Sequence, residues 1–159
     1  MNWAFALYLM WLPQLHLHKV PECLVENIEF YESRGKQFAT SPVGASGTMQ
    51  VMPRFSKLPR WLLFLPQGSR HEGTRILCRW YRRANGDLRL ALAGYNGGNK
   101  ALRGEMPRAL GYADRVISRA RRKGCLTTNI CGRRPRKKNF AKAQKAQPLP
   151  QPSTSSGQR

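Results

Sequence analysis

The fold of this chain is decided by residues 32–53, ESRGKQFATSPVGASGTMQVMP, which follow a segment with the spacing of an amphipathic helix, residues 21–34. The apolar stripe of this helix consists of Leu24, Val25 and Ile28. Glu32 falls inside that stripe, apart from the other glutamates of the segment. Because apolar surroundings disfavour the charged form of a carboxyl, we expect the pKa of Glu32 to be raised. A carboxylic acid of this kind is what protonates the leaving oxygen when a glycosidic bond is cleaved.

The residues that follow this carboxyl are typical of a loop that surrounds it. The Ser-Pro pair at 41–42 ends any helix, because proline disfavours the helical conformation in the residue before it. Residues 44–47, GASG, offer backbone with small side chains, which a bulky ligand can approach closely. Gln50 then supplies an amide, between the flexible apolar side chains of Met49 and Met52. This composition indicates a binding surface beside the acid.

The motif resembles the catalytic domain of soluble lytic transglycosylases, the relatives of goose-type lysozyme. Its positions fit without gaps at Glu32, Ser41, Gly44, Gly47, Gln50 and Met52. The sequence GDLRLALAGYNGG at residues 86–98 is similar to the second motif of that family, and Tyr112 with Val116 is similar to the third. The resemblance covers roughly residues 20–122.

The resemblance implies a mainly α, lysozyme-like helical domain with a substrate groove. It implies that a single acid, Glu32, cleaves the β-1,4 bond between N-acetylmuramic acid and N-acetylglucosamine in peptidoglycan and leaves 1,6-anhydromuramoyl ends. It calls for neither a metal nor an organic cofactor. The substrate-binding residues that it implies are Ser41, Gly44, Gly47, Gln50, Met52, Tyr95, Asn96 and Tyr112.

These positions also have structural interpretations, which stay open. Ser41 can cap a turn, and Met52 can fill the core, as methionine often does. Tyr95 and Tyr112 can pack in the core, and Asn96 can end its helix. The function has alternatives too: a muramidase that admits water to the same intermediate, or an inactive peptidoglycan-binding relative. The intact Glu32 argues against the inactive relative.

The sequence departs from the family pattern at two places. The family usually has an Asn-Ile pair four residues before the glycine matched by Gly73, where this chain has Ser69 and Arg70. The family often has a glutamate four residues before the tyrosine matched by Tyr112, where this chain has Arg108. The first departure concerns local substrate contacts, and the second concerns the surroundings of the acid.

The charge of the chain is strongly positive and unevenly distributed. The formal net charge is +20, all eight acidic residues precede residue 115, and 13 of the 28 Lys and Arg residues follow residue 114. Such a field attracts anionic polymers, so we expect residues 123–159, a basic tail poor in apolar residues and predicted to be disordered, to adhere to an anionic cell wall. Nucleic acid is a second class of partner for this tail. We expect the protein to be a monomer.

The N-terminal segment, residues 1–19, contains an apolar run that is too short to span a bilayer. Two interpretations stay open: an atypical export signal, or a first helix that packs on the domain. Export agrees with a place in the cell envelope, the periplasm or the extracellular space, and with a bacterial or a phage origin.

The four cysteines show no C-x-x-C pair. We expect Cys23 and Cys78 to be small core residues, whereas Cys125 and Cys131 either pair across a short loop or stay free. No histidine stands at a ligand spacing from them, so zinc is not indicated.

Three further helices are predicted from apolar spacing, over residues 74–83, 88–95 and 113–120. The glycines at 97–98 are expected to stop the second of these. Residues 54–73 give no clear pattern. The remaining acids are predicted to be surface or capping residues: Glu72, Asp87, Glu105 and Asp114.

Overall fold

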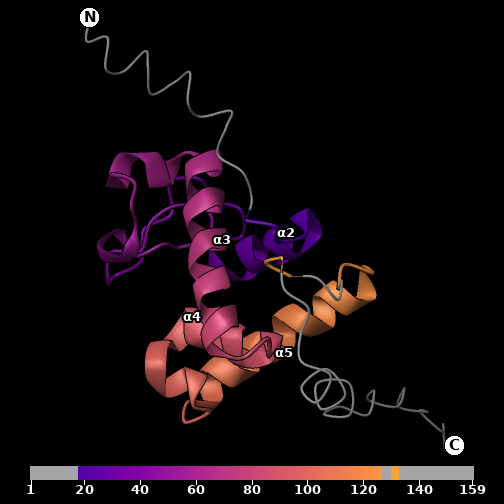
Figure 1. Ribbon diagram of the computed structural model, residues 1–159. Helices are drawn as coiled ribbons and strands as arrows, with labels where there is room; N and C mark the ends of the chain where they lie inside the picture. The colour runs from indigo at the N-terminus through magenta and orange to yellow at the C-terminus, as the bar shows by residue number, and fades with distance from the viewer. Residues whose placement is uncertain (1–17, 127–129, 133–159) are drawn as a thin grey trace, which may run out of the picture.

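A computed structural model describes residues 18–126 and 130–132 of the 159-residue chain (Figure 1). Its α-helices are α2 (Glu22–Glu32), α3 (Pro66–Arg83), α4 (Leu88–Leu102) and α5 (Pro107–Arg122). Two 3-10 turns, η2 (Pro53–Phe55) and η3 (Arg60–Phe64), lie between α2 and α3. The described residues form no β-strand; isolated bridges join Thr40 to Ser46 and Ser46 to Val51. The predicted mainly α, lysozyme-like fold class is confirmed.

The helices are arranged around α3, which runs along the middle of the domain in Figure 1. Helix α5 packs against both α4 and α2, and α3 packs against α4 and η3. The loop after α2, together with η2 and η3, lies on the other side of α3 from α2 in this view. The domain therefore has two parts, a loop-rich part formed by residues 33–64 and a helical part that contains α4 and α5.

The core is built from the apolar stripes that the sequence indicated. On α2, the predicted residues Leu24, Val25 and Ile28 are all fully buried. On α5, the small and branched residues that repeat every three or four positions are buried: Ala109, Ala113, Val116 and Ala120. Complete burial of a leucine or isoleucine side chain contributes about 1.5–3 kcal/mol, so these stripes decide how the helices pack.

Three helix boundaries differ from the prediction. Helix α3 begins at Pro66 instead of residue 74, because Pro66 suits the first turn of a helix and the glycines after it allow close packing. A Cβ atom at Gly73 would lie 2.4 Å from the sulfur of Met49. Helix α4 continues to Leu102, but its backbone breaks at Gly98 with φ 73° and ψ −153°, close to the predicted stop. Helix α5 begins at Pro107 instead of residue 113.

The prediction for the cysteines is wrong. Disulfides join Cys23 to Cys125 and Cys78 to Cys131, so neither Cys23 nor Cys78 is a free core residue and Cys125 does not pair with Cys131. The paired Cα atoms lie 5.6 and 5.4 Å apart, although they are separated by 102 and 53 residues. The tertiary fold brings the paired cysteines together, and their spacing in the sequence does not indicate which cysteines pair.

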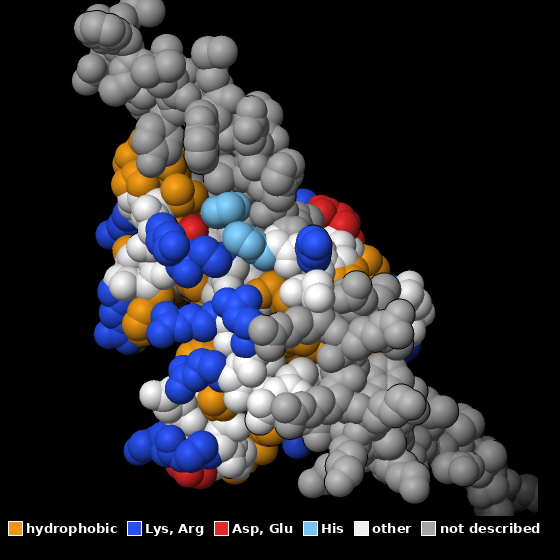
Figure 2. Space-filling model, viewed as in Figure 1, with side chains coloured by type: hydrophobic (Ala, Val, Ile, Leu, Met, Phe, Trp, Pro, Cys, Tyr) orange, Lys and Arg blue, Asp and Glu red, His pale blue; other side chains and the backbone are white. Residues whose placement is uncertain are grey.

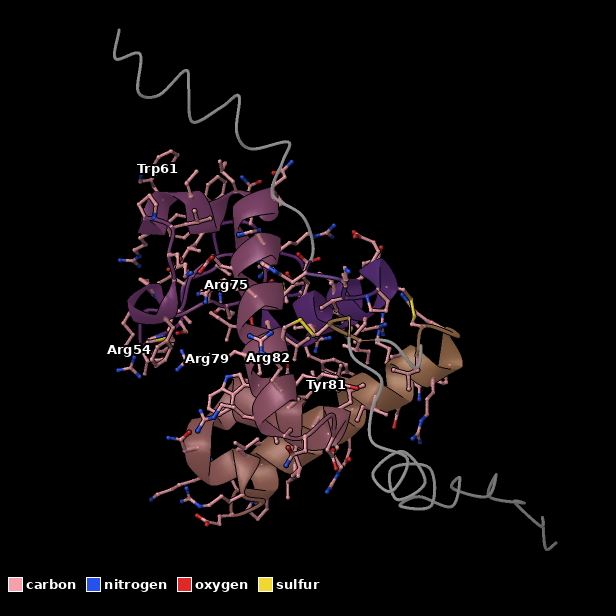
Figure 3. All side chains as sticks on the ribbon, in the orientation of Figure 1. Arg54, Trp61, Arg75, Arg79, Tyr81 and Arg82 are labelled. Atoms are coloured by element: carbon pink, nitrogen blue, oxygen red, sulfur yellow. A yellow bond between two sulfur atoms is a disulfide. The ribbon has the colours of Figure 1, made fainter. Side chains whose placement is uncertain are left out.

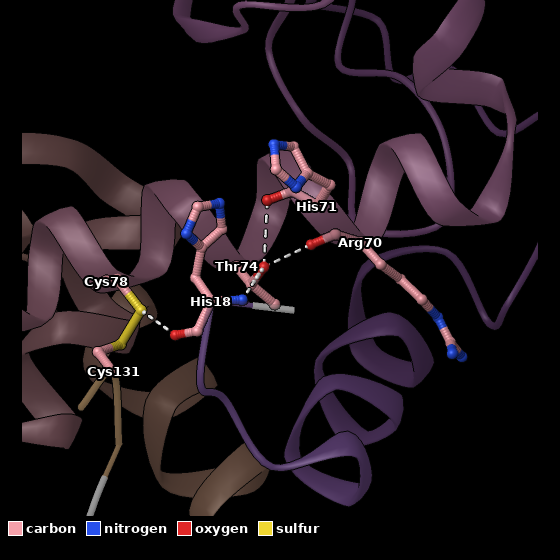
Figure 4. The surroundings of a disulfide bond; sticks show 6 residues. All are labelled: His18, Arg70, His71, Thr74, Cys78 and Cys131. Carbon is pink, nitrogen blue, oxygen red and sulfur yellow. Dashed lines mark hydrogen bonds between the residues drawn. A yellow bond between two sulfur atoms is a disulfide. The ribbon is translucent and has the colours of Figure 1, made fainter. Parts of the chain in front are cut away.

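The two disulfides attach the segment after α5 to the domain. Cys125 and Ile130 are buried, and the Cys131 amide donates a hydrogen bond of 3.0 Å to the Lys19 carbonyl. Figure 4 shows the second disulfide beside His18, whose carbonyl oxygen lies 3.2 Å from the sulfur of Cys78. Residues 123–126 and 130–132, which the prediction assigned to the basic tail, are thus among the described residues and are joined to the domain by the two disulfides. The rest of the predicted disordered tail, residues 127–129 and 133–159, lies outside the described residues, as do residues 1–17 of the predicted N-terminal segment.

Candidate active site

Glu32 is the last residue of α2, and the chain turns away directly after it. The backbone of Arg34 and Gly35 has positive φ, 59° and 74°, which no helix continues. The Ser33 hydroxyl donates a hydrogen bond of 2.7 Å to the carbonyl of Thr48. This bond fixes the end of α2, and with it Glu32, to the far side of the loop that follows.

The carboxyl of Glu32 is partly shielded from water. The residue as a whole keeps some exposure, whereas its Oε1 atom is buried. Burial raises the pKa of Glu32 to about 7, although the side chains of Tyr112 and Asn96 beside it act in the opposite direction. Among the described residues, neither Oε1 nor the Tyr112 hydroxyl makes a hydrogen bond of normal geometry. Glu32 thus exchanges its proton near neutral pH, and its Oε1 atom has no hydrogen-bond partner in the part of the chain that the structure describes.

Helices α4 and α5 bring three predicted site residues toward this carboxyl. Tyr112 of α5 is 5% exposed, and Asn96 of α4 is exposed. Tyr95 of α4 donates a hydrogen bond of 2.7 Å from its hydroxyl to the carbonyl of Met49, so it connects α4 to the loop. Burial, reinforced by Glu32, raises the pKa of both tyrosines well above the ordinary value, and both therefore remain hydrogen-bond donors.

Two predicted substrate-binding residues hold the loop itself together. The Ser41 hydroxyl accepts a hydrogen bond of 3.0 Å from the amide of Ala45, which is the turn-capping role left open above. The side-chain amide of Gln50 donates hydrogen bonds to the carbonyls of Ala39 and Gly47, at 3.2 and 3.0 Å. Both side chains thus shape the backbone near the acid.

The two glycines of the loop, Gly44 and Gly47, are favoured for different structural reasons. Gly47 has φ 80°, and a Cβ atom there would lie 1.8 Å from the carbonyl oxygen of Leu63 in η3. Gly44 has φ 87° and no atom within 4 Å of such a Cβ, so only its turn conformation favours glycine. Met52 is half-buried, next to η2. The loop therefore requires glycine at 47 in order to pack against η3.

Comparison with protein families matches residues 13–115 to the family described as transglycosylase SLT domain. This chain belongs to the transglycosylase SLT domain family. The structure of an inactive mutant of the lytic transglycosylase Slt from Pseudomonas aeruginosa is similar to it, with a TM-score of 0.58 and 22% sequence identity. The similarity covers 66% of this chain and 22% of that chain, and at this identity it shows the fold. No curated protein matches the chain.

The comparisons confirm the resemblance that the two motifs indicated. Because the SLT domain described here spans 22% of the Pseudomonas protein, the activity of that whole protein does not transfer directly to this chain.

The SLT domain also has supporting residues that sequence reasoning missed. Ser69 is completely buried in α3, and its hydroxyl accepts a hydrogen bond of 3.0 Å from the amide of Met49. It therefore holds the loop from the position where the family usually has asparagine. The departure from the family pattern was the signal for this contact.

Glu72 is the clearest wrong prediction among the acids, because it is completely buried and not on the surface. Its carboxylate accepts a hydrogen bond of 2.8 Å from the amide of Lys57 and pairs with Arg75 at 2.7 Å. Burial alone raises the pKa of Glu72, but these hydrogen bonds outweigh it and hold the pKa below the ordinary value. Glu72 thus fastens the segment after η2 to α3.

The surface of the SLT domain is hollowed where its two parts meet. Figure 2 shows a recess at the left edge, between the part formed by residues 33–64 and the part that contains α4 and α5. Glu32 lies at this junction, because Tyr112 and Asn96 approach it from the helical part and the loop begins directly after it. In the part of the chain that the structure describes, no three metal-ligating side chains are grouped. No helix of residues 18–126 and 130–132 has the length and apolar character needed to cross a membrane.

Proposed function

We propose that this SLT domain is a peptidoglycan lytic transglycosylase in which Glu32 acts as both acid and base. The observation that carries the proposal is a half-buried carboxyl with a pKa of about 7, at the junction of the two parts of an SLT domain. General acid–base catalysis is most effective when the pKa of the group lies near the working pH. The bond that it cleaves is the β-1,4 bond between N-acetylmuramic acid and N-acetylglucosamine.

The reaction has two steps and returns the proton to its donor. Glu32 gives its proton to the glycosidic oxygen as the bond from C1 to that oxygen breaks, and the N-acetyl group of the muramoyl sugar stabilises the cation at C1. The Glu32 carboxylate then takes the proton of the C6 hydroxyl, whose oxygen bonds to C1 and closes a 1,6-anhydro ring. No water is consumed, and Glu32 ends the cycle protonated.

The surroundings of Glu32 suit both steps. Burial keeps the carboxyl protonated before cleavage, and the side chains of Tyr112 and Asn96 stabilise the carboxylate that forms afterwards. Tyr95 supports the loop through the Met49 carbonyl. We propose that Ser41, Gly44, Gly47, Gln50 and Met52 form the sugar-binding side of the recess.

A second catalytic carboxylate has no support among the described residues. Three other acids close to the core are already paired with arginines: Glu29 with Arg70, Glu72 with Arg75 and Asp114 with Arg89. The two-carboxylate arrangement of ordinary glycosidases needs an acid that is free to act. The single-acid route is therefore the one that the geometry supports.

Mass spectrometry of the products of purified peptidoglycan tests the proposal. A lytic transglycosylase releases fragments with anhydromuramoyl ends, whereas a muramidase adds one water to each new end. Anhydro ends support the proposal, hydrated ends indicate the muramidase, and an absence of fragments indicates an inactive binding relative.

The two disulfides support a place outside the cytoplasm, in the cell envelope or the extracellular space, because structural disulfides form and persist in oxidising compartments. The proposed substrate lies in the same compartments. We propose that the protein acts there as a monomer and that its basic tail, residues 123–159, adheres to the anionic wall.

A further inference from the structure

A row of arginines crosses one face of the domain. Arg75, Arg79 and Arg82 stand at positions i, i+4 and i+7 of α3 and therefore share one side of that helix. Arg54 of η2 continues the row beyond the helix, as the labelled side chains in Figure 3 show. We call these four residues the arginine row.

Three of the four members of the arginine row have no acidic partner among the described residues. Glu72 is the one acidic residue in the sequence of α3, and its carboxylate already pairs with Arg75. The other three members, Arg54, Arg79 and Arg82, are exposed, and no acidic side chain among the described residues pairs with them. An unbalanced row of guanidinium groups attracts anions with planar, two-oxygen groups.

The arginine row lies along the recess. Figure 2 shows Lys and Arg side chains on the upper border of the hollow, and Figure 3 places Arg54, Arg79 and Arg82 at this height, with Arg75 above them. Arg54 is also close to the loop motif in the sequence, because it follows Met52 and Pro53 directly. A glycan strand bound in the recess would therefore present its substituents to the row.

We infer that the arginine row binds carboxylates of the short peptides that peptidoglycan carries on its muramoyl residues. The inference rests on the proposed function, because it concerns the substrate of the same recess. The carboxylates are covalently attached to the strand being cleaved, so they reach the row at a high effective concentration. Each peptide is attached to a muramoyl residue, the sugar whose bond is cleaved, so its carboxylates lie close to the scissile bond. The domain therefore prefers peptide-bearing strands to bare glycan.

The experiment compares two substrates and two matched variants of the full chain. The substrates are peptidoglycan freed of phosphate polymers, with its peptides intact or removed by an amidase. The test variant is Arg79→Gln/Arg82→Gln, which removes two charges at exposed helix positions and keeps good helix formers. The control is Arg122→Gln/Lys123→Gln, which removes two exposed charges at the far end of α5, on the opposite side of the view in Figure 1.

The test variant is expected to raise KM for peptide-bearing strands about three- to tenfold at low salt, with kcat unchanged and with the effect shrinking as salt rises. On bare strands the KM of the test variant should match that of the unchanged protein. The control variant should alter KM by no more than about twofold on either substrate. An equal loss on both substrates, or no loss on either, overturns the inference. In a parallel binding assay on walls that retain their phosphate polymers, a loss of binding by the test variant that is confined to those walls also overturns the inference.

Binding to the same two substrates, measured by sedimentation, separates this inference from the proposed function. If the unchanged protein cleaves neither substrate, the proposed function fails. The inference about the arginine row is still supported if binding weakens both when the peptides are removed and when Arg79 and Arg82 are replaced. It is overturned if either change leaves binding unaltered.

Discussion

Glu32 should make the folded domain less stable as the pH rises, and Glu32→Gln should remove this dependence. Burial raises the pKa of Glu32 from 4.5 to about 7 in the folded protein. Below pH 4.5 the residue is protonated in both the folded and the unfolded chain, so its full contribution to stability is present. Between pH 4.5 and 7 the unfolded chain releases the proton first, and stability falls until the folded protein releases it too.

The size of this effect follows from the shift. One pKa unit corresponds to about 1.4 kcal/mol, so the difference in unfolding free energy between Glu32→Gln and the unchanged protein should grow by about 3 kcal/mol from pH 4 to pH 8, in favour of the variant. Urea unfolding at the two pH values measures the difference, in which the titration of all other groups cancels.

The control for this measurement is Glu26→Gln, which removes an exposed carboxylate from the same helix. Its difference from the unchanged protein should vary by less than about 0.5 kcal/mol between the two pH values. If the difference in unfolding free energy between Glu32→Gln and the unchanged protein is equally independent of pH, Glu32 is not a buried carboxyl with a raised pKa.

Three further predictions concern activity and the frame of the site. Above pH 7, kcat/KM should fall about tenfold per pH unit as Glu32 loses its proton, and a rate that stays level to pH 9 would contradict its role as the acid. Cys23→Ser/Cys125→Ser should lower the free energy of unfolding by about 4.7 kcal/mol in the chain-entropy model, because the disulfide joins residues that are 102 positions apart; a loss below about 1 kcal/mol in urea unfolding would contradict this. Gly47→Ala should lower the free energy of unfolding by more than about 3 kcal/mol, since its Cβ would meet the backbone of η3. Gly35→Ala, at a position with positive φ but open space, should lower it by about 1 kcal/mol. Equal losses would show that the close packing at Gly47 is unimportant.

The fold and the position of the acid were predictable because local patterns encode them. The stripe of Leu24, Val25 and Ile28 fixed both the helix and the side on which Glu32 lies, and all three side chains are buried as expected. The glycines at 97–98 likewise indicated the break that Gly98 makes in α4. These features depend on residues within a few positions of one another, which a single sequence displays directly.

The parts that were missed depend on contacts between distant segments. No residue near Cys23 in the sequence indicates that it pairs with Cys125. Glu72 has the sequence context of a surface residue, and its burial depends on the hydrogen bond from the amide of Lys57, 15 positions away. The early start of α3 was hidden because Gly68 and Gly73 weaken its helical pattern. Those glycines are there for packing: a Cβ at Gly68 would lie 2.1 Å from the carbonyl oxygen of Leu62.

The same distinction separates the site residues from one another. The sequence placed Ser41 and Gln50 near the acid but left their roles open, and the structure gives both of them hydrogen bonds within the loop. Ser69 was noticed only as a departure from the family pattern, and its bond to the Met49 amide explains how the loop is held without the usual asparagine.

The most direct test of the account is the release of soluble fragments from purified peptidoglycan by Glu32→Gln, measured beside Glu26→Gln at pH 6. The account predicts that Glu26→Gln matches the unchanged protein, whereas Glu32→Gln stays folded and loses at least about 10²-fold in rate, the contribution of general acid–base catalysis. Release of fragments by Glu32→Gln at the rate of its control would contradict the claim that Glu32 is the proton donor.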